Sequence, residues 1–380
     1  MKKNLLMFLY LLITSLWLSG QVQLTIEPSN AVLGEPLVLQ GRICNQDNQY
    51  WILDLWRLIL VDAETHWEEY VDNLPGEHVD IGDPFWRDTI HVDAGQCRTE
   101  KAGMRFSKSG DYRVKWVYRP KEPYWKETDH MYKHLGGLTH MLQSKLTSQE
   151  VEIRIAEPRG EDKKAWDWML EVAREQGDGK YNKEKSEEVF ARELAATLSS
   201  NQWGMKLTGK IRKGILERFP SSTYAGWVLV VCSPGAKLEW ENGKALIDDM
   251  LKPVEKRKRW GDFVLDPEGK NYPKTKDGKY FIKSAEEEAR EFIQYAEPFV
   301  KAHPNHIKSA VIYKHLSTAY MVLHQWQKAY NAGQQSLNLG WDIEGFKEPK
   351  RNRMLKEKKV FEEALKELNS RGLAKSSLLQ

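Results

Sequence analysis

The sequence predicts a multi-domain β plus α chain, in which a β-sandwich is followed by a set of α-helices. Up to about Ala156, apolar residues alternate with polar ones or form short β-branched runs, with turns such as the one at Gly34 between them. After Pro158 the apolar residues recur at helical spacing as far as the C-terminus. This change of pattern gives a predicted β domain at 21–156 and a predicted helical domain at 157–380.

Residues 1–20 have the composition of a secretory signal peptide. Two lysines precede an apolar run at 5–18, and small residues follow it at 19–20. The run is shorter than the roughly 20 residues of a spanning helix, and no later stretch is long enough either. We expect export with cleavage, an uncleaved anchor being the alternative. The mature chain is then periplasmic, at the cell surface or secreted, with no membrane span.

Charge and cysteine content exclude two classes of protein. The chain has 57 Lys and Arg against 54 Asp and Glu, and two of the lysines belong to the signal, so we expect no nucleic-acid partner. The basic run at 255–260 is predicted to be a solvated loop, with an acidic partner as the alternative. Three cysteines, Cys44, Cys97 and Cys232, are too few for a disulfide scaffold.

Six segments of the first domain have strand patterns. Some alternate apolar and polar residues, and others are short β-branched runs that end at turn residues. The segments lie at 21–28, 33–43, 50–61, 88–94, 111–118 and 148–158.

Three of these segments resemble strands of the immunoglobulin-like domains of bacteria. "NAVLGEPLVLQGRICN" is similar to the second strand of such domains, and "FSKSGDYRVKWVY" to the penultimate strand, with Tyr112 at the corner before it. The closing "EVEIRIAEP" resembles their last strand. The resemblance implies an immunoglobulin-like sandwich at 21–156. Val114 stands where the usual inter-sheet cysteine would be, so Cys44 and Cys97 are left as a disulfide candidate that is either bridged or free.

A long insertion near 120–146 separates the last two predicted strands. Loops at the ends of a sandwich often carry binding residues. Tyr124, Trp125 and Tyr132 are candidates for contact with a protein partner or a sugar, and covering the sandwich edge is the alternative role.

The same insertion holds the histidine cluster of the chain. Asp129 could cap a short helix that places His130 and His134 on one face, and His140 follows. Copper or zinc binding is the alternative to ordinary surface histidines. We expect no metal and no cofactor.

The sequence contains none of the common catalytic motifs. H-E-x-x-H, G-x-S-x-G, the P-loop and G-x-G-x-x-G are all absent. Cys232 lies in an apolar run that ends at a Pro-Gly break, which indicates a buried structural thiol. We therefore expect a protein that is not an enzyme, the alternative being a hydrolase whose site no motif marks.

Small side chains recur at helical intervals in "YKHLSTAYMVLHQWQKAYNAGQQSLNL", residues 313–339. The segment resembles a tetratricopeptide repeat, a helical hairpin whose small residues let two helices approach closely. Gly333 stands where that family usually has an aromatic residue, and Trp341 where it often has proline. The matching positions are Leu316, Ser317, Ala319 and Tyr320 in the first helix, and Trp326, Ala329 and Ser336 in the second.

One hairpin cannot bury its apolar face alone, so neighbouring helices are expected. The junctions at 215–230 and 299–316 look alike and resemble the repeat junctions of bacterial envelope proteins. Pro220 and Pro304 should each end a helix, with Ser221 or Asn305 capping the next one. We expect about three degenerate hairpins over residues 161 to 370.

The predicted function is a non-catalytic scaffold or adaptor that binds a protein partner through its helical hairpins. Lys314, Thr318 and Gln325 are polar residues that packing leaves unassigned, so we expect them to line a groove for an extended segment. The alternative from another class is glycan binding by exposed tryptophans. Six of the 15 tryptophans fall in the first domain, namely Trp51, Trp56, Trp67, Trp86, Trp116 and Trp125.

Overall fold

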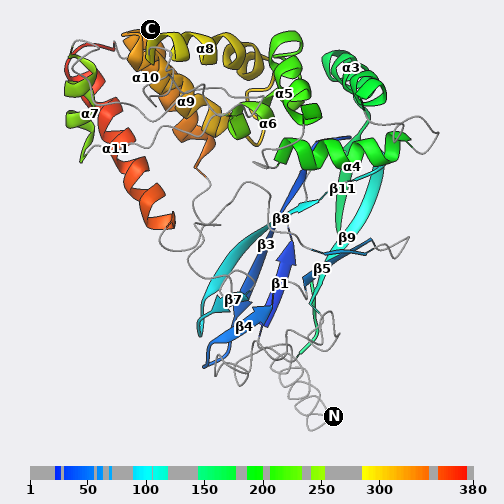
Figure 1. Ribbon diagram of the computed structural model, residues 1–380. Coiled ribbons are helices and arrows are strands. Elements are labelled where there is room, and N and C mark those ends of the chain that lie inside the picture. Colours follow the sequence, from blue (N-terminus) through cyan, green and yellow to red (C-terminus); the bar gives the residue numbers. More distant parts are fainter. Residues whose placement is uncertain are drawn as a thin grey trace, which may run out of the picture. The chain divides into compact units, whose positions relative to one another are not determined.

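The computed structural model shows a mixed α and β chain that divides into two compact units (Figure 1). Unit 1 comprises Met1–Ala31, Leu37–Met104 and Ser109–Ala156, and unit 2 comprises Val32–Pro36, Arg105–Lys108 and Glu157–Gln380. Unit 2 therefore contains two short segments from the first half of the chain. The structure describes residues 22–26, 30–54, 58–62, 68–70, 89–104, 106–118, 144–176, 186–199, 206–232, 241–252, 285–341 and 350–374.

Unit 1 consists of small sheets. The described strands are β1 Val22–Ile26, β2 Asn30–Val32, β3 Leu37–Asn45, β4 Trp51–Asp54, β5 Leu58–Asp62, β6 Glu68–Tyr70, β7 Thr89–Val92, β8 Cys97–Met104, β9 Gly110–Tyr118, β10 Leu146–Thr147 and β11 Val151–Ala156. They pair in the orders β1-β3-β8, β2-β11-β9-β5-β6 with β10 also on β9, and β4-β7.

The core of unit 1 forms where β3 meets β9. Leu37, Leu39 and Ile43 are fully buried at alternate positions of β3, as expected of a strand with one face inward. The ring of Trp116 on β9 lies against the backbone of Gly41, where an added Cβ would come within 1.7 Å of the ring. Gly41 is thus required for close approach of the ring and not for a turn.

A disulfide joins β3 to β8. Cys44 and Cys97 are directly opposite in the antiparallel register, with their Cα atoms 3.9 Å apart and a bond between their sulfur atoms. The bridge closes a chain segment of 53 residues. Cys232, in contrast, ends helix α6 of unit 2.

Unit 2 is built from helices. The described helices are α3 Gly160–Gln176, α4 Ser186–Ser199, α5 Lys206–Arg218, α6 Thr223–Cys232, α7 Gly243–Met250, α8 Ala285–Ala302, α9 Ser309–Val322, α10 Trp326–Leu339 and α11 Lys350–Ser370. None of the described helices is both long and apolar enough to cross a membrane.

Small residues allow α9 and α10 to pack closely. The hydroxyl of Ser317 donates to the carbonyl of Ala329, and that of Ser336 donates to the carbonyl of Ala310, both at 2.7 Å. A late residue of α9 thus pairs with an early one of α10, and the reverse, so the helices run antiparallel. Because both serine side chains are short, each hydroxyl reaches a backbone carbonyl of the facing helix and is hydrogen-bonded there.

Helix α11 packs against the far end of this hairpin. A Cβ on Gly333 would lie 2.6 Å from a methyl group of Leu365 on α11, so the missing side chain makes room for that leucine. The ring of Trp341 packs on Phe361 of α11 with centroids 5.5 Å apart. The two positions that depart from the tetratricopeptide pattern are therefore the positions that contact α11.

The predicted helix caps differ from those in the structure. Pro220 and Pro304 do follow the ends of α5 and α8, but Ser221 and Asn305 do not cap the next helices. At α6 the backbone N–H of Thr223 donates to Asp162 of α3 at 2.7 Å, and α9 begins without a side-chain cap. A partner from another helix replaced the local cap, which sequence pattern alone does not reveal.

Reduction of the Cys44–Cys97 disulfide should lower the free energy of unfolding of unit 1 by about 4 kcal/mol, because a loop of this length restricts the unfolded chain. Guanidinium unfolding followed by the fluorescence of Trp116 and its neighbours, with and without reductant, measures the difference. The Cys232→Ser variant is the control and should respond to reductant as the wild type does. Equal midpoints in oxidised and reduced protein would contradict this expectation.

Candidate functional site

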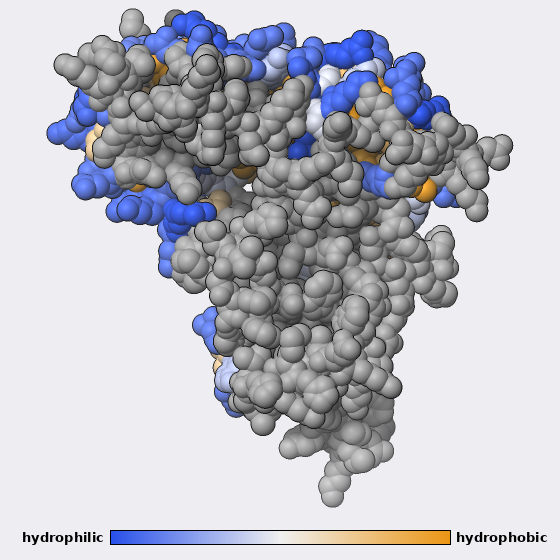
Figure 2. Space-filling model, in the orientation of Figure 1, coloured by the Kyte–Doolittle hydropathy of each residue, from blue (hydrophilic) through white to orange (hydrophobic). Residues whose placement is uncertain are grey.

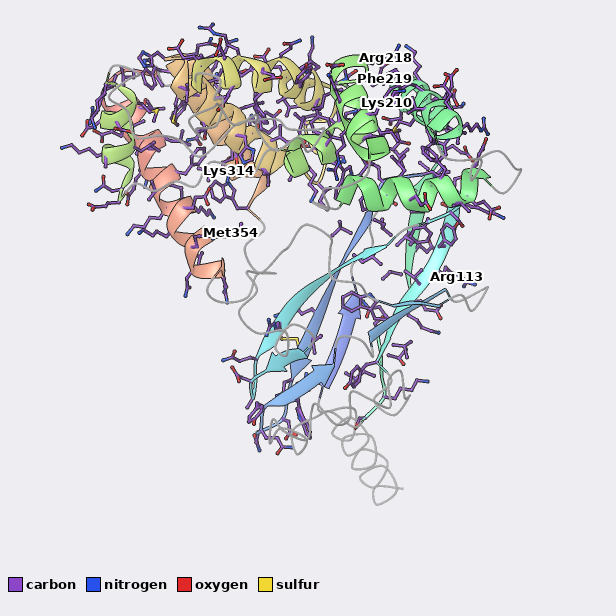
Figure 3. All side chains as sticks on the ribbon, in the orientation of Figure 1. Arg113, Lys210, Arg218, Phe219, Lys314 and Met354 are labelled. Carbon is purple, nitrogen blue, oxygen red and sulfur yellow. A yellow bond between two sulfur atoms is a disulfide. The ribbon has the colours of Figure 1, made fainter. Side chains whose placement is uncertain are left out.

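The surface predicted on α9 is covered in the structure. Thr318 is buried, and its hydroxyl donates to the carbonyl of Lys314 one turn earlier. The ammonium of Lys314 lies 2.7 Å from the carboxylate of Glu357 on α11, and Figure 3 labels it where α9 faces that helix. Lys314 and Thr318 therefore do not line an open groove, because α11 packs over this face. Gln325 is exposed at the start of α10.

Several predicted residues lie outside the described part of the chain. These are the aromatic candidates Tyr124, Trp125 and Tyr132, the histidines His130, His134 and His140, and the basic run at 255–260. The predicted signal peptide at 1–20 and most of the predicted insertion near 120–146 also lie outside it.

Of the tryptophans considered for glycan binding, the structure describes two. Trp116 is fully buried, so its ring is not available to a sugar. Trp51 is partly buried, and its indole N–H donates to Asp47 at 3.1 Å. Trp56, Trp67, Trp86 and Trp125 are outside the described residues.

The outward face of α10 carries a row of amide side chains. Residues three or four apart on a helix share a face, and here that spacing is kept over three turns. Asn331, Gln335 and Asn338 are exposed, whereas Gln327 and Gln334 are half-buried. The Gln327 amide donates to the side-chain oxygen of Asn331 at 3.0 Å. The opposite face holds the buried Ala329, Gly333 and Ser336.

This amide face has a single charged residue at its edge. It is Lys328, three residues before Asn331, whose ammonium lies over the ring of Tyr320 and 3.5 Å from Glu297. Amides carry both donors and acceptors and are less costly to remove from water than charged groups. The face therefore has the chemistry of a surface that hydrogen-bonds to peptide groups.

A second cluster of polar groups lies in the interior of unit 2, around Glu35. One carboxylate oxygen accepts from the indole N–H of Trp227 at 3.1 Å and lies 3.2 Å from Nε2 of His306. The other accepts from the backbone N–H of Val32 at 2.8 Å. Both oxygens of this buried carboxylate are thus hydrogen-bonded.

The tautomer of His306 follows from its neighbours. Its Nδ1 accepts from the backbone N–H of Lys308 at 3.2 Å, so the proton of the neutral ring is on Nε2 and points to Glu35. The Lys308 ammonium lies 4.4 Å from the centre of the Trp227 ring on the same side of the cluster. Burial alone would raise the pKa of Glu35, but the hydrogen bonds that His306 and the backbone N–H of Val32 donate to the carboxylate hold that pKa below its ordinary value.

The residues beside Glu35 anchor the same segment. The hydroxyl of Tyr224 donates to the carbonyl of Leu33 at 2.7 Å, and burial followed by the charges of Glu35 and Asp162 raises the pKa of that hydroxyl well above its usual range. A Cβ on Gly34 would come within 2.8 Å of both Trp166 and Leu194, and its φ of +90° favours glycine. The polar atoms of Glu35 and His306 have partners in α6 and in the segment itself, so the cluster ties this segment to the helices of unit 2.

Sequence reasoning treated "LGEP" as a turn that begins a strand and missed the buried carboxylate. Glu35 stands in an otherwise apolar stretch. An acid there must be paired if it is buried, but the sequence alone shows neither its burial nor its partner. His306 and Trp227 are about 270 and 190 residues away. Pairing between residues this far apart produces no periodic pattern in the sequence.

Among the described residues, no group of His, Cys, Asp and Glu side chains has the arrangement of a metal site. No protein-family model and no curated protein matches the sequence.

Glu35→Gln should lower the free energy of unfolding by about 2 to 4 kcal/mol at neutral pH, because its NH₂ group would replace a carboxylate oxygen that accepts a hydrogen bond and would face an N–H donor. The pKa of Glu35 is depressed in the folded state, so its stabilisation is present above the ordinary value of 4.5 and is lost as the pH falls through the lower folded value. Urea unfolding at neutral and acidic pH measures both effects.

The control for this experiment is Glu175→Gln, the same change at an exposed position of α3. It should leave the unfolding free energy of unit 2 unchanged within about 0.5 kcal/mol. A Glu35→Gln protein as stable as this control, or a gap between the two that does not narrow at acidic pH, would contradict the assignment.

Proposed function

We propose that the protein is an exported, non-catalytic scaffold or adaptor that holds an extended segment of a protein partner on its helical unit. In this proposal an immunoglobulin-like sandwich is followed by degenerate tetratricopeptide-like hairpins. The amide face of α10 carries the proposal, and it replaces the α9 residues Lys314 and Thr318 as the binding surface.

Two packing features support the tetratricopeptide part of the proposal. The helices α9 and α10 approach closely through Ser317, Ala329 and Ser336, which are the small positions of the matching pattern. Helix α11 then fills the space above Gly333, so the hairpin buries its second face against a following helix.

The Cys44–Cys97 bridge supports export. Disulfides persist in oxidising compartments and are rare in reducing ones. A signal-like segment at 1–20 agrees with the same compartment.

The chemistry of the amide face favours a peptide backbone as its ligand. An extended segment offers N–H and C=O groups that need partners of both kinds, and each Asn or Gln offers both. A partner that bound through charge would require unpaired charged residues on this face. The single lysine of α10 lies beside Glu297 instead.

Asn331→Glu together with Gln335→Lys should abolish partner binding while leaving the fold intact. The two new charges form an i, i+4 pair that stabilises the helix. Binding of a segment would remove water from both charged groups, and this desolvation is unfavourable. Capture from an envelope extract, quantified by mass spectrometry against the wild type, should fall by about ten-fold or more for the specific partner.

The matched control introduces the same two charges at exposed amides away from α10, as Gln294→Glu together with Gln96→Lys. It should capture the partner as the wild type does. Equal recovery of every protein by all three baits would overturn the proposal, and so would a partner lost equally with the control.

A further inference from the structure

The first turns of α11 form a second distinctive surface of unit 2. Six of the ten residues at 350–359 are Lys or Arg, and Glu357 is the single acid among them. Arg351, Arg353, Lys356 and Lys359 are exposed. Figure 2 shows hydrophilic side chains over this end of the helix, which Met354 marks in Figure 3.

The acidic residues of α11 are already engaged elsewhere. Glu357 pairs with Lys314, Glu362 lies 3.8 Å from Lys358, and Glu363 accepts from the backbone N–H of Gly243. Within the part of the chain that the structure describes, no acidic side chain pairs with Arg351, Arg353, Lys356 or Lys359. The charges of the helix are therefore separated, with the acids used in packing and the cations left outward.

The position of these cations works against the helix itself. The N-terminus of a helix carries partial positive charge, so acids are favoured in the first turn and cations are unfavourable there. The first turn of α11 has no acid and contains Arg351 and Arg353. A local arrangement that opposes helix stability indicates selection for something other than folding.

We propose that the surface formed by Arg351, Leu355 and Lys359, with Lys356 at its edge, docks the protein on a membrane that contains anionic lipids. Arg351 and Lys359 lie four residues before and after Leu355 and therefore share its side of the helix, and Leu355 is 47% exposed. A flat lipid surface meets one side of a helix, and here that side presents a cation, a leucine and a second cation in successive turns. An acidic peptide would instead need walls to hold it, and the neighbouring residues Asn352 and Met354 provide none.

Leu355 distinguishes a lipid surface from other polyanions. An apolar side chain between cations can enter the headgroup region while the charges meet phosphate groups. Each Lys or Arg near an anionic surface contributes roughly five-fold to binding, and the effect weakens as salt screens it.

The test is flotation of the purified exported protein with vesicles. Phosphatidylcholine vesicles with phosphatidylglycerol are compared with phosphatidylcholine alone, at low and physiological salt. Wild type should bind only the anionic vesicles. Arg351→Gln together with Lys359→Gln should weaken this binding by about 25-fold, and Leu355→Ser should weaken it with little change in salt dependence.

The matched control removes the same net charge at exposed lysines on other helices, as Lys210→Gln together with Lys301→Gln. It should bind as the wild type does. Because all variants share one N-terminus, any contribution of residues 1–20 is common to them. Glutamine favours helix, and removing cations from a helix N-terminus should leave the melting temperature equal or higher.

Three results would overturn the proposal. They are no flotation of wild type with anionic vesicles, equal losses in the α11 variant and the control, and equal binding to polyglutamate or duplex DNA. None of them depends on whether the amide face of α10 captures a partner.

Discussion

The packing of unit 2 depends on a buried carboxylate that comes from the first half of the chain. Glu35 cannot remain ionised in an apolar interior unless donors surround it, and Trp227, His306 and the N–H of Val32 provide them. Those donors belong to α6, to the turn before α9 and to the segment itself. One side chain therefore fixes three parts of the helical unit relative to each other, which an apolar residue of the same size would do less specifically.

The segment that carries Glu35 explains why the two halves of the sequence are not independent. Val32–Pro36 belongs to unit 2, although β3 begins directly after it in unit 1. Gly34 allows the chain to pass close to Trp166 and Leu194, and Tyr224 holds the carbonyl of Leu33. The helices are thus completed by residues that precede most of the β unit in the sequence.

The spacing of apolar residues in the sequence predicted those strands and helices whose formation depends on local interactions. The strands at β3, β9 and β11 and the helices α3, α9 and α10 fall in segments whose apolar spacing indicated them. The small positions Ser317, Ala329 and Ser336 were also identified as packing positions, and they are buried. Contacts between distant segments could not be predicted: Leu365 above Gly333, Glu357 beside Lys314, Asp162 at the start of α6 and His306 beside Glu35. In each case the decisive partner lies on another element, and a single sequence contains no record of that pairing.

The failed prediction at Lys314 shows that later helices decide which surfaces of a helix pair stay exposed. A polar residue on the first helix of a hairpin is open only while no later helix covers it, and α11 covers this one through Glu357. The same docking leaves Asn331, Gln335 and Asn338 of α10 exposed and holds the basic end of α11 at the surface. The two remaining surfaces differ in chemistry, because one is made of neutral amides and the other of cations beside a leucine. Neutral amides bind little to an anionic lipid surface, and cations do not select a peptide backbone. In the two proposals above, the unit would hold a partner and a membrane through different surfaces, so neither would compete for the other's site.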